Sequence, residues 1–120
     1  MSNAFTEDQE ALRVNFYRTD AGKEPVRDWL LQMDKQSRKA IGEDIKVVQL
    51  RWPLGMPLVR KIEANLWEIR SHVKDGIARV FFTVDRPVMV LLHGFIKKSQ
   101  RTPANELQVV RCRLADAKKE

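Results

Sequence analysis

The sequence is poor in the residues that build metal sites and disulfides. Its 120 residues include one cysteine, Cys112, and two histidines, His72 and His93. A single cysteine excludes an internal disulfide framework and any zinc site made of several cysteines. Two histidines argue against a histidine-based metal centre. We therefore expect no metal and no other cofactor.

Other signals are missing as well. No apolar run approaches the roughly 20 residues of a membrane span, and no basic start leads into an apolar stretch as in a secretory signal. There is no Walker loop, no Gly-rich dinucleotide turn and no Gly-x-Ser-x-Gly elbow. We expect a cytoplasmic protein without membrane contact. The length predicts a single domain over residues 11–118, after a disordered or cloning-derived tail at 1–10.

Positive charge is present in excess and is unevenly distributed. The formal net charge is +6. Residues 1–50 hold eight Lys/Arg and nine Asp/Glu, a net charge of −1. Residues 51–113 hold twelve Lys/Arg and five Asp/Glu, a net charge of +7. A basic half-chain indicates a polyanionic partner, first nucleic acid and second an acidic protein. A solvated basic surface without a partner is the alternative.

Hydrophobic periodicity predicts an α+β fold of order β-α-α-β-β-β-α, with a mainly antiparallel sheet. Consecutive short turns make the last three predicted strands an antiparallel meander. Alternation indicates a strand at 12–17, and helical spacing indicates helices over 25–33 and 41–51, with a polar break at 34–37. Strands follow at 66–71, 77–84 and 88–92, the last apolar enough to be the central strand and continuing towards 96. A weaker strand candidate at 58–62 is not counted. Thr102 is expected to cap a final helix with Pro103 at its first position.

The hairpin of 66–71 and 77–84 places two arginines together. The turn is centred on 74–75, which sets Arg70 opposite Arg79, or on 75–76, which makes them diagonal neighbours. Side chains alternate along strands, so both registers put Arg70 and Arg79 on one face, which Glu68 shares. The face is then either an Arg–Glu–Arg surface ladder or a phosphate-binding site.

A second basic cluster follows the last strand and consists of Lys97, Lys98 and Arg101. His93 stands at the end of that strand, and histidine can exchange a proton near neutral pH. It is therefore a candidate acid or base for RNA chemistry, although a strand histidine with purely structural partners is also compatible with the pattern. His72 falls in the predicted turn at 72–76 and is expected to be plain surface.

Several segments together resemble the RelE/ParE toxin superfamily, most closely its HigB-like branch of phage-derived Gp49-like proteins. The most specific strings are Leu-Trp-Glu-Ile-Arg at 66–70 and His-Gly-Phe-Ile-Lys-Lys at 93–98, the latter followed by Thr-Pro at 102–103 and by Glu106. The resemblance covers roughly residues 13–116. It implies a RelE-like fold with a small twisted sheet and two N-terminal helices on one side.

The resemblance also implies an activity, namely that of a type II toxin that cleaves mRNA on the ribosome and so inhibits translation. In that superfamily a 2′-OH attacks the adjacent phosphate. Transferred to this sequence, the resemblance implies five catalytic candidates and three RNA-binding ones. The catalytic candidates are Arg70, Arg79, His93, Lys97 and Lys98, and the RNA-binding candidates are Arg60, Lys61 and Arg101.

One departure concerns the general base. RelE-type toxins often carry a tyrosine near the C-terminal helix, but the only tyrosine here is Tyr17, on the first predicted strand. His93 is the remaining candidate. The implied partners are mRNA on the ribosome and a helix-turn-helix antitoxin, through which alone the protein reaches operator DNA. A ParE-like poison of DNA gyrase and a non-catalytic co-repressor module are the competing functions.

Overall fold

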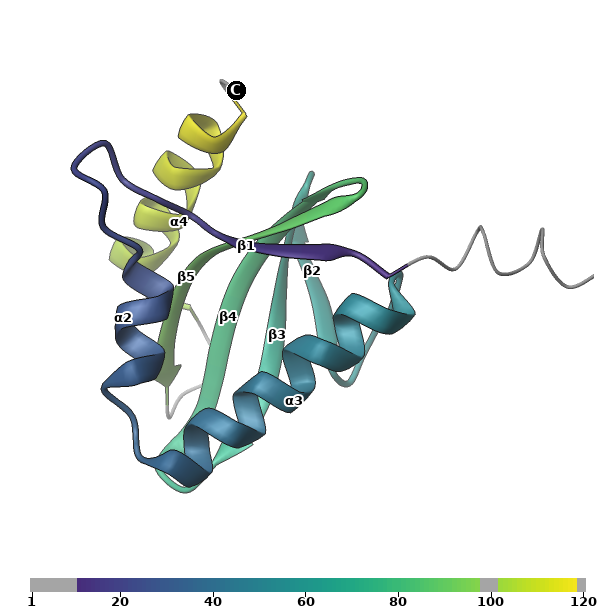
Figure 1. The fold of residues 1–120 in the computed structure, drawn as a ribbon, viewed down its shortest axis with the longest axis vertical. Helices are drawn as coiled ribbons and strands as arrows, with labels where there is room; N and C mark the ends of the chain where they lie inside the picture. Colours follow the sequence, from purple (N-terminus) through teal and green to yellow (C-terminus); the bar gives the residue numbers. More distant parts are fainter. Residues whose placement is uncertain (1–10, 98–101, 119–120) are drawn as a thin grey trace, which may run out of the picture.

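Eight elements build the fold in the computed structural model, which describes residues 11–97 and 102–118 (Figure 1). The expected tail at 1–10, Lys98 and Arg101 lie outside the described residues. In chain order the elements are β1 (Arg13–Phe16), α2 (Pro25–Leu31), α3 (Lys35–Arg51), β2 (Val59–Glu63), β3 (Leu66–Val73), β4 (Gly76–Asp85), β5 (Val88–Lys97) and α4 (Ala104–Ala117).

The strands form one sheet in the order β1-β5-β4-β3-β2. β1 runs parallel to β5, and every other neighbouring pair is antiparallel. The predicted α+β class, with a mainly antiparallel sheet and β3, β4 and β5 as a meander, is confirmed. The described segments contain no helix that is long and apolar enough to cross a membrane.

Local sequence explains the two helices on one face of the sheet. Pro25 occupies the start of α2, where a missing N–H costs nothing. Asp34 caps α3 by accepting a hydrogen bond from the Ser37 amide at 3.0 Å. The spacing of Ile41, Ile45 and Val48 then turns one side of α3 towards the sheet, and all three are buried.

The sheet has a hydrophobic core on each face. α2 and α3 cover one face, and α4 lies on the other (Figure 1). The larger core, under α2 and α3, contains Ile41, Val48, Ile69, Val80, Phe82 and Leu91 among others. The smaller core, under α4, consists of Leu66, Phe81, Leu92, Val110 and Leu114.

Four expectations about element positions need correction. The weak candidate at 58–62 is a real edge strand, β2, because it pairs with β3. The middle strand is β4 rather than the strand beginning at Val88, because β1 adds beyond β5. α3 begins at Lys35 inside the expected break, and α4 has Pro103 rather than Thr102 at its N-cap position, without a side-chain cap hydrogen bond.

A fifth expectation, on the end of β3, also needs correction. The strand continues to Val73 and pairs there with Gly76, so the tight turn is only Lys74-Asp75. His72 therefore lies in a strand and not in a turn. The same register sets Arg70 directly opposite Arg79, the first of the two arrangements that the sequence allowed.

Candidate active site

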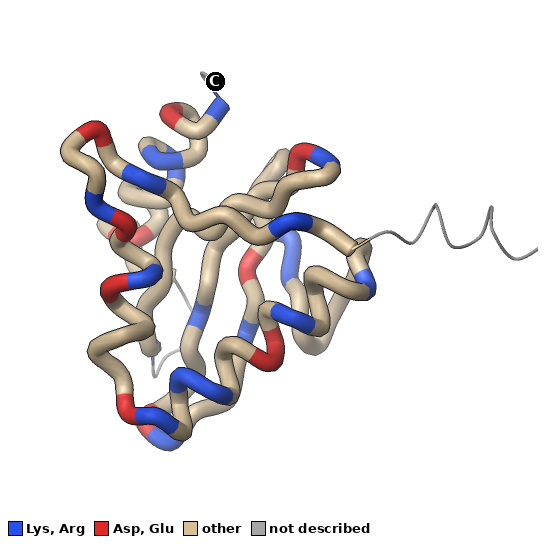
Figure 2. Tube along the Cα trace, viewed as in Figure 1, with Lys and Arg blue, Asp and Glu red and all other residues tan. Residues whose placement is uncertain are grey.

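Cationic side chains gather on the part of the sheet's α4 face that lies beyond the α4 core. Arg70 pairs with Arg79, and Glu68 pairs with both Phe81 and Arg60, so strand alternation puts these side chains on the face that carries Phe81. We call the set Arg60, Glu68, Arg70, Arg79 and Lys97 the cationic face. Basic residues lie on the strands as well as on the outer helices (Figure 2).

Glu68 holds the centre of the cationic face. Its side chain is fully buried, and Arg79, only 1% exposed, places Nη1 3.4 Å from both Glu68 carboxylate oxygens. Arg60 approaches the same carboxylate at 3.8 Å but keeps half of its side chain exposed. A buried charge pair is costly to break, so Glu68 fixes Arg79 in place.

Arg70 completes the pair without sharing this carboxylate. It lies directly opposite Arg79, and two like charges at such a position repel each other. The Arg70 Nε is buried and has no hydrogen-bond partner in the described part of the chain. Buried donors normally have a partner. An anion bound between the two guanidinium groups would provide one, and phosphate matches guanidinium geometry in a bidentate way.

The remaining basic candidates take different places. Lys97 pairs with Ile77, two residues along β4 from Arg79 and on the same face, and is 9% exposed. Lys61 pairs with Trp67 and thus lies on the opposite face from Arg60. The structure therefore brings Arg60, Arg70, Arg79 and Lys97 together and separates Lys61 from them.

His93 stands apart from the cationic face, under α4. A bulge in β5 opposite Phe81 and Phe82 inserts one extra residue, Leu92, just before His93. Phe95 pairs with Arg79 and stacks on Phe81 with ring centroids 5.9 Å apart, so aromatic rings lie between the histidine and the arginines.

Both ring nitrogens of His93 have partners. Nε2 lies 2.5 Å from the Glu106 carboxylate at the start of α4, and Nδ1 lies 3.1 Å from Arg113 Nη1. Arg113 also donates to the Leu92 carbonyl at 2.9 Å. Because arginine can only donate, Nδ1 must accept, and the ring proton of the neutral imidazole is assigned to Nε2. Burial lowers the pKa of Arg113 from its usual value.

Tyr17 also contacts α4 and helps to hold it on the sheet. Its hydroxyl donates to Asp116 at 2.6 Å, and Arg113 lies over its ring at 5.7 Å. The hydrogen bond to Asp116, together with burial, raises the pKa of Tyr17 above its ordinary value. β1 is separated from β3 by two strands, so this tyrosine is remote from Arg70.

His72 is a candidate that the sequence interpretation missed. It continues the alternation of Glu68 and Arg70 on β3, is exposed, and pairs with Ile77, the residue that also pairs with Lys97. The available signal was the spacing of two residues that separates Glu68, Arg70 and His72. The predicted turn at 72–76 hid that signal.

No group of three or more metal-ligating side chains occurs within the described residues. The cationic face therefore presents guanidinium and ammonium groups on the sheet, and the imidazole of His72 lies beside them. Such a set can bind a phosphate and stabilise negative charge that develops on it.

Two comparisons with known proteins bear on this arrangement. A comparison with curated protein sequences finds no match. The sequence model of one family, described as "phage derived protein Gp49-like", matches residues 28–115, a stretch that includes every strand except β1. The chain therefore belongs to the Gp49-like family, within the RelE/ParE/HigB toxin superfamily.

Proposed function

We propose that this protein is the toxin of a type II toxin–antitoxin system and inhibits translation as a ribosome-dependent mRNA endoribonuclease. Membership of the Gp49-like family supports a toxin of the RelE/HigB kind. The observation that carries the nuclease proposal is the Arg70–Arg79 pair, with a buried donor on Arg70 that has no partner within the described chain. A phosphate of the RNA backbone is the ligand that this pair fits.

The proposed reaction is attack of a 2′-OH on the adjacent phosphate. Extra negative charge then develops on the non-bridging oxygens, which Arg70 and Arg79 stabilise. Lys97 and Lys98 contribute phosphate binding or protonate the leaving 5′ oxygen. Arg60 and Arg101 contact the RNA chain around the cleaved bond, whereas Lys61, on the opposite face of the sheet, would bind RNA only away from that bond.

His93 is the base that the sequence favours, and its role stays a prediction. To accept a proton at Nδ1 it has to lose the Arg113 hydrogen bond, and to accept one at Nε2 it has to leave Glu106. Activity through His93 therefore requires the Glu106 or the Arg113 side chain to release the ring. Because the ribosome aligns the mRNA, positioning supplies much of the rate enhancement, and we expect little cleavage of naked RNA.

Membership of a toxin superfamily also implies a cognate antitoxin. We propose that it is a helix-turn-helix protein and that contact with operator DNA occurs only through it. Acidic residues on the antitoxin would complement the cationic face. Masking this face would also limit the loose binding of nucleic acids that an uncovered cationic protein shows.

The test is induced expression in a bacterial host, followed by mapping of mRNA 5′ ends. We expect growth arrest with new cuts in translated messages. Arg70→Ala should abolish growth arrest and cleavage. It removes a guanidinium that forms no hydrogen bond or ion pair with a described residue, and it leaves the buried Glu68–Arg79 pair intact. Arg13→Ala is the matched control, since it removes an exposed arginine from β1 at the other end of the sheet.

The outcomes separate the competing functions. Arrest and cleavage that persist in Arg70→Ala would contradict the assignment of the cationic face. Arrest with intact messages and accumulated cleaved DNA–gyrase complex would indicate a ParE-like gyrase poison. Soluble protein that binds its antitoxin but never arrests growth would indicate a co-repressor module without catalysis.

A further inference from the structure

The end of β3 presents an imidazole beside the phosphate-binding arginines. β2 pairs with β3 only as far as Val59 opposite Ile69, and the Arg70 amide donates to the Leu58 carbonyl at 2.9 Å. Beyond that point β3 has no neighbour on this side within the described chain. His72 follows two residues after Arg70, on the same face and exposed to solvent.

His72 and Lys97 lie at the two ends of one row across the sheet. Ile77 pairs with both of them, so they are separated by two strand spacings, roughly 10 Å in total. Arg70 and Arg79 form the adjacent row. A phosphate held by the two arginines therefore has the imidazole on one side and the ammonium on the other.

This separation suits an in-line displacement at phosphorus. The attacking and leaving oxygens stand on opposite sides of the phosphorus atom, and each exchanges a proton with its own partner. Two hydrogen bonds of about 2.8 Å within roughly 10 Å leave about 4 Å for the two oxygens and the phosphorus between them. Two groups side by side on one strand would not straddle the phosphate in this way.

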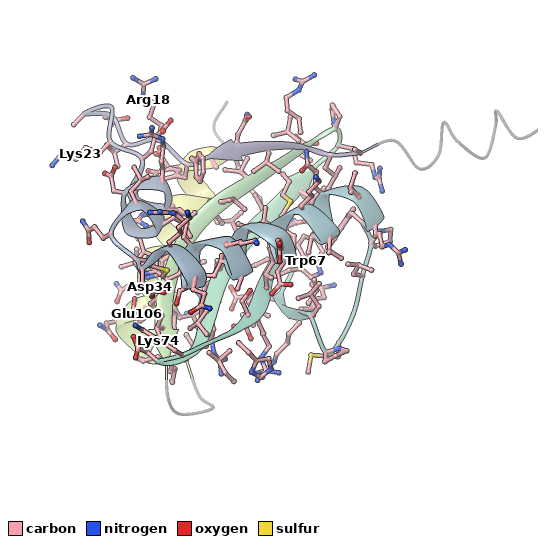
Figure 3. The ribbon with its side chains drawn as sticks, turned by 60° about the horizontal axis from the view of Figure 1, so that its bottom comes forward. Arg18, Lys23, Asp34, Trp67, Lys74 and Glu106 are labelled. Atoms are coloured by element: carbon pink, nitrogen blue, oxygen red, sulfur yellow. The ribbon has the colours of Figure 1, made fainter. Side chains whose placement is uncertain are left out.

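A cavity lies near His72 at the edge of the sheet, on the α3 side and thus on the face opposite to Arg70 and Arg79. It has a volume of about 270 Å³ and lies between the first turns of α3 and the end of β3, lined by Gln36, Ser37, Ala40, His72, Val73 and Lys74. Asp34 and Lys74 lie at this same end of the molecule (Figure 3).

We propose that His72 is the general base of the reaction, an inference that rests on the proposed nuclease function. His72 takes the proton of the 2′-OH, the 2′ oxygen bonds to phosphorus, and the bond from phosphorus to the 5′ oxygen breaks. The leaving oxygen gains a proton from Lys97 or from water. The products are a 2′,3′-cyclic phosphate and a 5′-OH end, so atoms and charge balance without a co-reactant.

Several elements next to His72 contribute charged side chains. β3 and its turn contribute Arg70, Lys74 and Asp75, β4 contributes Arg79, and β5 contributes Lys97. The residues of α3 that line the cavity with His72 are uncharged, and Asp34 precedes them at the N-cap. A change in the pH–rate profile is therefore assigned to His72 only where His72→Ala alters it.

The test is cleavage by the purified protein on ribosomes programmed with a defined mRNA. His72→Ala should lower kcat about 10²–10⁴-fold, with little change in KM, because the arginines still hold the phosphate. Added imidazole should restore part of kcat, and the acidic limb of the pH–rate profile should disappear in His72→Ala. Lys39→Ala, an exposed lysine of α3, is the control that should leave cleavage unchanged.

Each possible outcome has one meaning for the inference. Cleavage by His72→Ala within about threefold of the wild-type rate would overturn the inference, and so would a slow variant that keeps the wild-type pH profile and ignores imidazole. The same loss and the same imidazole rescue in His93→Ala, but not in His72→Ala, would return the role to His93. Absence of cleavage by the wild-type protein would instead refute the nuclease proposal itself.

Discussion

Replacing Gly94 should test how closely α2 packs against the sheet. Gly94 lies on β5 beneath Trp29 of α2, and a Cβ atom there would come within 2.4 Å of Trp29 Cζ3 and 2.5 Å of Cε3. Carbon atoms in contact normally stand about 3.5–4.0 Å apart. In Gly94→Ala the indole ring therefore has to withdraw by about 1 Å, and α2 has to move with it.

Overpacking of this kind costs about 1–3 kcal/mol. At about 4 °C per kcal/mol for a chain of this length, a cost of about 2 kcal/mol lowers Tm by about 8 °C. Urea unfolding followed by far-ultraviolet circular dichroism measures the loss without relying on tryptophan fluorescence. The m-value should stay constant, because the surface exposed on unfolding hardly changes.

A double-mutant cycle with Trp29→Ala tests the cause. In that background the obstructing ring is gone, so Gly94→Ala should cost nothing or stabilise slightly by restricting the unfolded chain. The coupling energy should then be about 1–3 kcal/mol. An equal cost of Gly94→Ala in both backgrounds, or no cost in either, would refute the steric argument.

Two further predictions concern polar contacts. Tyr17→Phe removes the hydrogen bond to Asp116 and should cost about 1 kcal/mol in urea unfolding. The raised pKa of Tyr17 means that this stabilisation is complete below about pH 10 and is lost as pH rises through the folded-state value, so the variant should lack that alkaline decline. Glu68→Gln removes the carboxylate that Arg79 and Arg60 share and should cost about 3 kcal/mol, whereas an unchanged urea midpoint would show that the buried pair is not needed for folding.

The local parts of the fold could be predicted from sequence because they depend on local periodicity. The spacing of Ile41, Ile45 and Val48 identifies α3, and alternation identifies the hairpin of β3 and β4. The shared face of Arg70 and Arg79 also follows, since side-chain alternation holds in either register. Whether Arg70 and Arg79 lie directly opposite each other depends on the position of the turn, and the sequence allowed two positions.

Long-range contacts account for what the sequence did not reveal. β1 pairs in parallel with β5 across most of the chain, and β2 is stabilised as a strand only by its pairing with β3. The surroundings of His93 depend on the β5 bulge and on Glu106 and Arg113 arriving from α4. None of these has a local sequence signal, and the catalytic potential of a histidine depends on such neighbours.

The charge asymmetry of the sequence divides into two physical roles. Arg113 holds α4 on the sheet by donating to Leu92 and His93, and Arg111 pairs with Glu63 of β2 at 2.6 Å. These arginines add to the net charge of residues 51–113 but are used for attachment. Because α4 is anchored over Leu66, Phe81 and Leu92, it leaves the neighbouring part of the same face to the other cations. The position of the helix therefore decides which basic residues are available to a phosphate.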